Sequence, residues 1–435
     1  MTDWYDVVIV GGGFGGAFCA RRLEHLLRGR SERVLVIAPE NFLLFSPLLP
    51  EAASGTLEPR HAVIPLRELL RRTRVLAGRV SDLDVAGRTA EITDLNGDTR
   101  PVGFRTLVLS PGSVPTTLPI PGLVEHAVGF KTLADAIWLR NRVLHQLEAA
   151  EAASDRDERR RLLTFTFVGG GYAGVEALAE LESLARDASR TYRNFTIDDT
   201  RWVLVELADT LLPGLDARLA RYTEKVLRKR GVEVRLSTRV TNCEDAVVQL
   251  SDEAVAPYPS GTIVWTAGQR PSDLGRHAGL PVDDRGRILV DDHLRVSGLA
   301  DVYAVGDAAA VPDPSHPGGL CPGTAQHALR QGLRAAGNVA ADLGVGEAGP
   351  FTYKTRGLAV TLGRASGTAQ VRKATFTGFL AWWMGRSYHL LMMPGLARKT
   401  RVVGDWTISL LFPRDVAQLG TLGTPSPLPP PERPA

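Results

Sequence analysis

The sequence predicts an α/β protein with two doubly wound units, because two glycine-rich segments each follow an apolar strand pattern and precede an Ala/Leu-rich helix pattern. The first segment reads Gly11-Gly12-Gly13-Phe14-Gly15-Gly16, and the second reads Gly169-Gly170-Gly171-Tyr172-Ala173-Gly174. Between a strand and a helix, G-x-G-x-x-G spacing is typical of a turn that holds a pyrophosphate on free N–H groups at the helix N-terminus. We therefore expect two Rossmann-like dinucleotide-binding domains.

The residues of each turn have separate tasks. The first glycine allows the bend, the second lets the backbone approach the pyrophosphate, and the third lets the helix pack on its strand. This assigns one set of residues to the first dinucleotide: Gly11, Gly13, Phe14, Gly15 and Gly16. It assigns a second set to the other dinucleotide: Gly169, Gly171, Tyr172 and Ala173. The alternative is a glycine-rich turn without a ligand, and two copies in the same context argue against it.

Length and composition limit the function classes. With 435 residues, 44% of them hydrophobic, the chain can bury enough surface for two or three domains. A net charge of +3 is too mild to favour a nucleic acid partner. The cysteines Cys19, Cys243 and Cys321 form no C-x-x-C pair, so we expect no disulfide framework, no metal site and a reducing cytoplasmic compartment. The first strand begins by residue 6, and apolar runs are short, so neither export nor a spanning helix is expected.

The strand ends indicate which dinucleotide binds where. The second strand of the second unit ends at Glu206, and a carboxylate there favours NAD(H) and repels the 2′-phosphate of NADP(H). A solvent-facing acid is the alternative for Glu206. In the first unit the corresponding acid is absent or displaced to Glu40. A third apolar strand leads into Gly306 and Asp307, and an acid in that position can reach a second polyol, such as the ribitol of FAD.

The elements follow one another in an order that divides the chain into four parts. Residues 1–117 and 295–350 form the predicted FAD-binding domain, and residues 160–290 form the predicted NAD(H)-binding domain. Residues 351–420 lose the alternation of strands and helices and gather aromatic and basic side chains. Residues 424–435 contain six prolines and are predicted to be disordered.

Together these motifs resemble the pyridine-nucleotide flavoprotein oxidoreductases, and more narrowly the type II NADH dehydrogenases, which are single-subunit NADH:quinone oxidoreductases that do not pump protons. The resemblance extends to about residue 420. Its more specific motifs are Asn41 to Pro50 with Gly55 to Glu58, Lys131 to Leu133 with Asp135 and Ala136, Gly174 to Glu176, Trp265 to Gly268, Ala304 to Asp307 and Pro322 to Gln326.

The resemblance implies a site for hydride transfer from NADH to FAD and then for two-electron transfer to a membrane quinone, either menaquinone or ubiquinone. It places Glu176 near the nicotinamide and the quinone, as a candidate proton relay, and it gives the Gln326 amide to a quinone carbonyl. A helix first-turn acid is the alternative for Glu176. The resemblance also implies further cofactor contacts: Ser46, Val80, Ser110, Gly112, Gly268 and Ala325.

Some positions depart from the family pattern. Tyr172 and Ala173 stand where many members have Pro-Thr, and Arg330 replaces a frequent second glutamine. Cys321 and His327 are interpreted as packed residues rather than catalytic ones. Other flavoproteins of the same fold remain alternatives, namely a sulfide:quinone oxidoreductase or a soluble NADH-dependent reductase. A flavin-binding regulatory protein with vestigial turnover is a third alternative.

The C-terminal region has the composition of a membrane contact. A first apolar stretch, interrupted by Gly385 and Arg386, ends at Pro394, and a basic cluster of Arg398, Lys399 and Arg401 follows. Apolar faces beside arginines are typical of interfacial helices on an anionic membrane surface. We therefore expect a peripheral protein on the inner face of the cell membrane. A homodimer interface and a helix packed on the core are the alternatives for this region.

Overall fold

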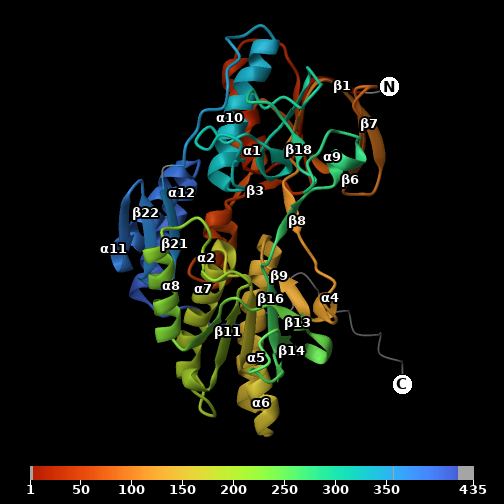
Figure 1. Ribbon diagram of the computed structural model, residues 1–435. Coiled ribbons are helices and arrows are strands. Elements are labelled where there is room, and N and C mark those ends of the chain that lie inside the picture. Colours follow the sequence, from red (N-terminus) through yellow and green to blue (C-terminus); the bar gives the residue numbers. More distant parts are fainter. Residues whose placement is uncertain (1–2, 356, 420–435) are drawn as a thin grey trace, which may run out of the picture.

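Two parallel sheets, each in its own lobe, organise the chain, and a smaller third layer packs against both lobes (Figure 1). The computed structural model describes residues 3–355 and 357–419. The predicted disordered segment 424–435 lies outside the described residues. The prediction of an α/β fold with parallel sheets is confirmed.

The first lobe contains a parallel sheet in the order β5-β2-β1-β7-β19. Its strands are β1 (Asp3–Val10), β2 (Val34–Ala38), β5 (Arg74–Asp84), β7 (Thr99–Leu109) and β19 (Val302–Ala304). β6 (Thr89–Asp94) adds an antiparallel part to the same sheet, because it pairs with the long strands β5 and β7. Helices α1 (Phe14–Leu26) and α10 (Ala325–Asp342) pack closely at Gly332. Any larger residue at this position would place its Cβ 2.1 Å from the Gly15 carbonyl oxygen.

The second lobe contains a parallel sheet in the order β12-β11-β10-β16-β9. Its strands are β9 (Ala127–Gly129), β10 (Thr164–Val168), β11 (Arg201–Val205), β12 (Val232–Arg235) and β16 (Thr262–Trp265). Its main helices are α5 (Leu133–Ala152), α6 (Arg156–Leu162), α7 (Tyr172–Ala188) and α8 (Ala217–Lys229). Strands β13 (Val240–Asn242), β14 (Val247–Leu250) and β15 (Tyr258–Pro259) form a small antiparallel sheet beside it.

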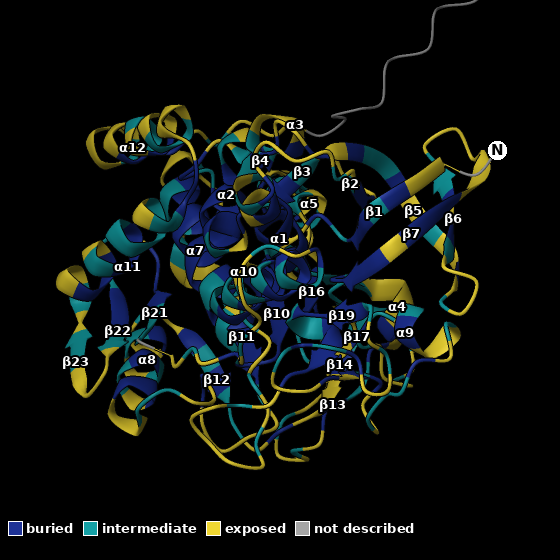
Figure 2. Ribbon diagram, turned by 90° about the horizontal axis from the view of Figure 1, so that it is seen from above, coloured by how far each residue is buried: buried dark blue, intermediate teal, exposed yellow. Residues whose placement is uncertain are grey.

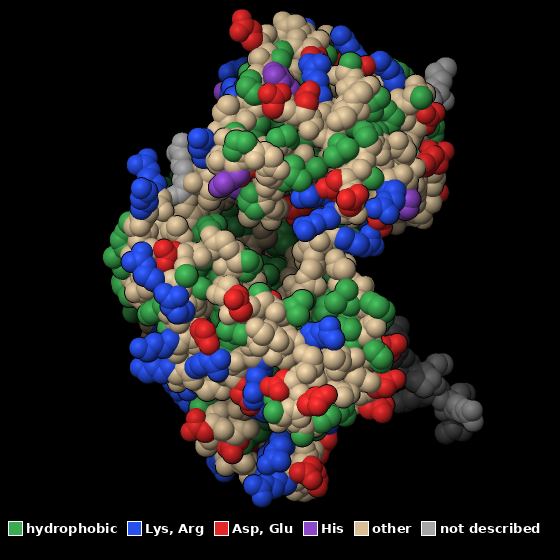
Figure 3. All heavy atoms as spheres, viewed as in Figure 1, with side chains coloured by type: hydrophobic (Ala, Val, Ile, Leu, Met, Phe, Trp, Pro, Cys, Tyr) green, Lys and Arg blue, Asp and Glu red, His purple; other side chains and the backbone are tan. Residues whose placement is uncertain are grey.

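The second lobe does not coincide with the predicted domain of residues 160–290. Strand β9 and helix α5 precede residue 160 but belong to the second lobe, because β9 pairs with β16. Residues after 270 pack in the first lobe, where Leu280 and Ile288 join the core. Two strands cross between the lobes as an antiparallel pair, β8 (Ser113–Pro115) and β17 (Gln269–Pro271). The molecular surface is hollowed between the lobes at this crossing (Figure 3).

The C-terminal layer is a three-stranded antiparallel sheet with two helices. Its elements are β21 (Gly357–Thr361), β22 (Gly367–Val371), β23 (Ala374–Thr377), α11 (Gly378–Met392) and α12 (Leu396–Leu411). Val360 and Leu362 enter the core of the second lobe, whereas Val402 and Trp406 enter the core of the first. The layer is therefore attached to both lobes. The outer faces of α11 and α12 are exposed (Figure 2).

Short elements complete the described chain. They are β3 (Phe42–Leu44), α2 (Leu49–Ala53), β4 (Val63–Pro65), α3 (Leu66–Leu69), α4 (Leu123–His126), α9 (Leu274–His277), β18 (Ile288–Leu289) and β20 (Ala309–Ala310). Within residues 3–355 and 357–419, no helix combines the length and the hydropathy that a membrane crossing requires.

Candidate functional site

The two glycine turns have almost the same backbone geometry. Gly11 and Gly169 both adopt positive φ, +109° and +111°, which favours glycine at the bend. A Cβ on Gly16 would lie 1.9 Å from the Gly11 carbonyl oxygen, and one on Gly174 would lie 2.1 Å from the Gly169 carbonyl oxygen. Each turn is thus closed by a helix that packs directly on the bend.

The middle glycines leave space where a pyrophosphate would bind. Gly13 and Gly171 are the N-cap residues of α1 and α7, and a Cβ on either would meet nothing within 4 Å. Neither helix has a side-chain cap or an acid in its first turn. Free N–H groups, a favourable helix dipole and open space fit a dinucleotide at each turn.

The first turn lies against β7 and the residues that follow it. A Cβ on Gly15 would lie 2.5 Å from the Ser110 Oγ, and Gly112 adopts a φ of +75° two residues later. The Phe14 ring begins α1 and packs against Phe45 with ring centroids 5.5 Å apart. Ser110 therefore lies against the first turn, and its role and those of Gly112 and Phe14 as cofactor contacts stay predictions.

The acids at the strand ends differ between the lobes. Glu206 follows β11, and its carboxylate accepts the Gly170 N–H at 2.5 Å and the Ala208 N–H at 2.8 Å. Its position thus orients the second turn directly. Glu40 lies exposed two residues after β2, without such an anchor among the described contacts. Two other predicted contacts lie farther along the chain: Val80 is half-buried on β5, and Ser46 is exposed.

Asp307 belongs to a polar chain between the lobes. Gly306 adopts a φ of +75°, and its N–H donates to the Gln331 side chain at 2.8 Å. The Asp307 carboxylate accepts the Ser113 hydroxyl at 2.8 Å, and the Lys131 ammonium donates to the Ser113 Oγ at 2.6 Å. Burial lowers the pKa of Lys131, and the charge of Asp307 opposes this effect.

Sequence reasoning did not assign Lys131 or Ser113 to the site. The Lys131 ammonium also donates to the side-chain Oε1 of Gln269 at 2.5 Å, so it links β8 and β17 next to Asp307. Gly268, just before β17, adopts a φ of +88°, and its carbonyl accepts the Thr116 N–H. The Lys131-Thr132-Leu133 motif was a signal for this residue, but its role depends on Gln269, which lies 138 residues later in the chain.

Glu176 connects the second turn with the C-terminal sheet. It lies on α7 beyond the first helical turn, which contains no acid, so the interpretation as a first-turn acid is wrong. Its carboxylate accepts the Thr361 N–H at 2.8 Å and the Thr361 hydroxyl at 3.2 Å. Burial raises the pKa of Glu176 to about 8, although the hydrogen bonds from Thr361 oppose the shift.

Tyr172 occupies the first position of α7, beside Glu176. Its hydroxyl is buried and, among the described residues, has no hydrogen-bond partner. Burial and the nearby Glu176 charge raise the pKa of Tyr172 to about 12, so the phenol stays protonated. The next residue, Ala173, is exposed. The tyrosine therefore presents a proton donor at the second turn, where many family members have proline.

Gln326 and Arg330 share one aromatic partner. Gln326 lies in the first turn of α10, next to Ala325. Its side-chain Oε1 accepts a hydrogen bond from the Tyr353 hydroxyl at 2.9 Å. Its amide nitrogen donates weakly to the Gly357 carbonyl at 3.4 Å. The Arg330 guanidinium lies 4.3 Å from the Tyr353 ring centroid. The substitution at Arg330 thus adds a positive charge beside the Gln326 amide.

A buried ionic network joins the C-terminal layer to both lobes, and it was not predicted. The Arg386 guanidinium donates to Glu51 at 3.0 Å, and Trp406 donates to the other oxygen of the same carboxylate at 2.5 Å. Arg414 pairs with Glu180 at 3.1 Å. Arg386 was expected to interrupt an exposed apolar stretch. Instead it lies inside, because its charge is satisfied by Glu51.

The remaining sequence candidates are structural. His327 is buried, its ring contacts the Thr324 hydroxyl at 2.8 Å, and burial lowers its pKa. Cys19 and Cys243 are buried, and Cys321 is half-buried. Burial raises the pKa of the Cys321 thiol to about 11, so its reactive thiolate is scarce at neutral pH. These cysteines do not favour the sulfide:quinone alternative.

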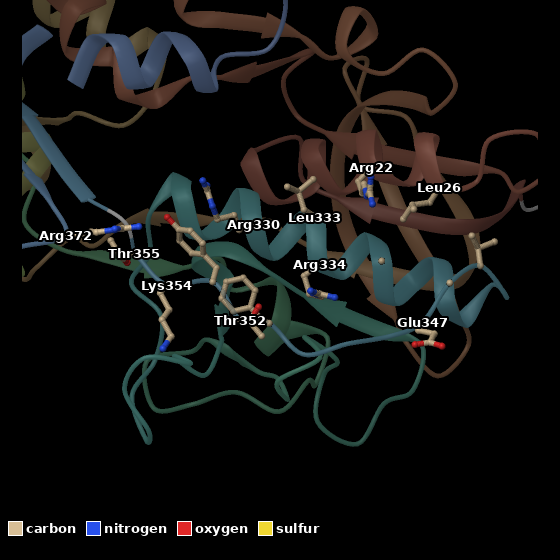
Figure 4. A pocket seen from close by; sticks show the side chains of 15 residues that line it. Arg22, Leu26, Arg330, Leu333, Arg334, Glu347, Thr352, Lys354, Thr355 and Arg372 are labelled. Carbon is tan, nitrogen blue, oxygen red and sulfur yellow. The ribbon is translucent and has the colours of Figure 1, made fainter. Parts of the chain in front are cut away.

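Two cavities lie over α1 and α10 and share Arg22 and Leu333. The larger has a volume of about 940 Å³ and is lined by Arg330 and Arg334 of α10 and by Lys354 beyond it (Figure 4). The smaller has a volume of about 840 Å³ and is lined by α1, by residues after α3 and by Met392. Both lie outside the two glycine turns.

The paired turns, with Glu206 after β11 and Asp307 after β19, define a flavoprotein class that binds two dinucleotides. Residues 5–332 match the pyridine nucleotide-disulphide oxidoreductase family. The type II NADH:quinone oxidoreductase Ndh of Mycobacterium tuberculosis is 32% identical over 423 residues, which cover 94% of this chain and 89% of that protein. The chain belongs to the type II NADH:quinone oxidoreductase family, as the sequence motifs indicated.

Two further comparisons agree with this assignment. The internal alternative NAD(P)H-ubiquinone oxidoreductase A1 of Arabidopsis thaliana mitochondria is 29% identical, and the match covers 95% of this chain and 85% of that protein. The structure of NDH2 from Plasmodium falciparum in complex with NADH has a TM-score of 0.86 and 18% identity. That match covers 95% of this chain and 99% of the other, and it shows a shared fold.

Proposed function

We propose that this chain oxidises NADH and reduces a membrane quinone, with FAD bound at the first glycine turn and NADH at the second. The observation that carries the proposal is the pair of open cradles at Gly13 and Gly171, each at an uncapped helix N-terminus. The Glu206 carboxylate next to the second cradle favours NADH over NADPH. When bound, FAD would accept a hydride and return two electrons.

The chain itself supplies position and charge for this reaction. In this proposal Asp307, which accepts a hydrogen bond from Ser113, would bind the ribitol hydroxyls of FAD. Lys131 contributes a positive charge at the crossing of β8 and β17. The same pair of strands connects the two lobes that carry the cradles.

Quinone reduction also consumes two protons, and Glu176 is the proposed relay. Its carboxyl group keeps a proton at neutral pH because its pKa is about 8. Its carboxylate accepts a hydrogen bond from Thr361, the last residue of β21 in the C-terminal sheet. The neighbouring Tyr172 hydroxyl is a second buried donor in the same place.

The Gln326 amide is the proposed contact for a quinone carbonyl. A carbonyl accepts hydrogen bonds, so it would replace the Gly357 oxygen as the partner of the amide nitrogen. That bond is long, 3.4 Å, and costs little to exchange. The bond from the Tyr353 hydroxyl would keep the amide oriented meanwhile.

We also propose that α11 and α12 contact the membrane from the inner face of the cell. Ten large apolar side chains are exposed on and beside these helices: Phe379, Leu380, Trp383, Leu391, Leu396, Val403, Ile408, Leu410, Leu411 and Phe412. Exposed apolar side chains in this number favour a lipid or protein partner. A homodimer through the same face is the alternative occupant. Serine substitutions of the exposed Trp383, Leu391 and Leu411 should release the protein from the membrane fraction and leave the buried residues of both helices in place.

Steady-state oxidation of NADH by the purified chain tests the proposed activity. Menaquinone and ubiquinone analogues, ferricyanide and oxygen serve as acceptors, and NADPH serves as the comparison donor. We expect quinone analogues to support the fastest turnover and NADH to exceed NADPH. Turnover with ferricyanide but with neither quinone would contradict the proposal and favour a soluble reductase.

A further inference from the structure

The smaller of the two cavities has an unusual concentration of arginines. Three come from α1 and the turn that follows it, and two come from the segment after α3 (Leu66–Leu69): Arg21, Arg22, Arg28, Arg71 and Arg72. We call this cavity of about 840 Å³ the arginine cavity. Its floor is apolar, formed in part by Phe18, Leu69 and Met392. Arginines around an apolar floor suit a ligand with anionic and hydrocarbon parts.

Its arginines are not neutralised within the described part of the chain. All five are exposed, and among residues 3–355 and 357–419 none of their guanidinium groups makes an ion pair or a hydrogen bond to another residue. The single acid in the lining, Glu24, instead accepts the backbone N–H groups of Arg72 and Thr73, both at 2.7 Å. Five charges therefore converge on the cavity with one carboxylate among them.

The cavity is continuous with the apolar face of the C-terminal helices. Met392, the last residue of α11, lines it, and Leu391 beside it is 74% exposed. On another side, Arg398 of α12 pairs with Glu68 of α3 at 3.8 Å, three residues before Arg71. The arginines therefore lie at the edge of the surface that we assign to the membrane.

We propose that the arginine cavity binds the headgroup phosphates of anionic phospholipids, so that the first lobe contacts the membrane together with the C-terminal helices. Guanidinium groups bind phosphate with paired hydrogen bonds, and the apolar floor would accommodate the first methylenes of an acyl chain. Charge complementarity and continuity with α11 and α12 select a lipid over a free anion. This inference rests on the membrane contact in the proposed function.

Vesicle partition of the full chain tests this inference. Vesicles of phosphatidylcholine alone and with phosphatidylglycerol are compared for the wild type and for Arg71→Gln/Arg72→Gln. Each basic residue near an anionic surface contributes about fivefold to binding, so the double variant should bind the anionic vesicles about thirtyfold more weakly. The matched control is Arg79→Gln/Arg100→Gln, which removes two exposed charges from β5 and β7, outside the cavity.

The controls separate this inference from the activity. Flavin content and NADH oxidation with a water-soluble quinone analogue should be unchanged in both double variants. If Arg71→Gln/Arg72→Gln does not fold, Arg21→Gln/Arg28→Gln takes its place and should show the same loss. Equal partition of cavity and control variants would overturn the inference, as would full competition by millimolar glycerol phosphate, which would indicate a site for free anions. Failure of the wild type to reduce the soluble quinone would instead contradict the proposed activity.

Discussion

The two glycine turns have the same backbone, but the helices that follow them meet different surroundings. Helix α7 carries two buried acids that form ion pairs, Glu180 with Arg414 and Glu182 with Arg230. Through Arg414 this network reaches the segment that follows α12. Helix α1 instead presents Arg21 and Arg22 to an open cavity. Each turn therefore forms the same open cradle at a helix N-terminus, whereas the outward residues of the helix determine what else each lobe contacts.

Removal of the cation from the α7 network should have the largest effect. Arg414→Met leaves Glu180 buried without its partner, which costs roughly 3–5 kcal/mol of the free energy of unfolding. Urea denaturation monitored by tryptophan fluorescence measures this change. The matched control is Arg218→Met, which removes only an exposed pair with Asp216 and should change the free energy of unfolding little. Equal losses of unfolding free energy in the two variants would contradict a larger contribution from the buried network.

Matched substitutions at the open glycines should separate the two dinucleotides. Gly171→Ala should retain flavin but slow its reduction at low NADH by about a hundredfold, since a phosphate hydrogen-bond set of roughly 3 kcal/mol is lost. Gly13→Ala should lose flavin during gel filtration. The control Gly337→Ala lies on α10, also in open space, and should change neither. Flavin loss from Gly171→Ala would reverse the assignment.

The strand-end acids should also behave differently. Glu206→Gln removes the charge that repels a 2′-phosphate, so the ratio of kcat/KM for NADH over NADPH should fall by about tenfold. Glu40→Gln should leave that ratio unchanged, because Glu40 belongs to the first lobe. Measurement of both ratios tests the assignment. A change at Glu40 and none at Glu206 would contradict it.

The smallest expected effect concerns pH. A Glu176 carboxyl group with a pKa of about 8 donates a proton at neutral pH and loses it as the pH rises through 8, so quinone turnover should decline there. Glu176→Gln should turn over more slowly with a flatter profile. By linkage, the wild type should also lose stability relative to this variant as the pH rises from about 4.5 to about 8. An unchanged profile would remove the relay.

The sequence was sufficient where local backbone geometry determines the outcome. The turns at Gly11 and Gly169 need positive φ and close helix packing, so their spacing predicted both units. Glu206 was predictable because a strand end directly precedes it. The two turns and Glu206 were therefore predictable from their positions within a single strand-turn-helix unit.

Long-range partners were not predictable in the same way. Arg386 contacts Glu51 across 335 residues, and no local pattern indicates that this arginine is buried. The Asp307 chain likewise depends on Ser113, 194 residues earlier. Strand β9 joins the second lobe because of its pairing with β16, which single-sequence periodicity does not reveal.

Anaerobic stopped-flow mixing tests the central claim most directly, because it observes both half-reactions on one purified chain. We predict that NADH bleaches the flavin absorbance within the turnover time and that a quinone analogue then restores it. In Gly171→Ala the first phase should slow while the second stays unchanged. Flavin that NADH does not bleach, or that quinone does not reoxidise, would contradict the account.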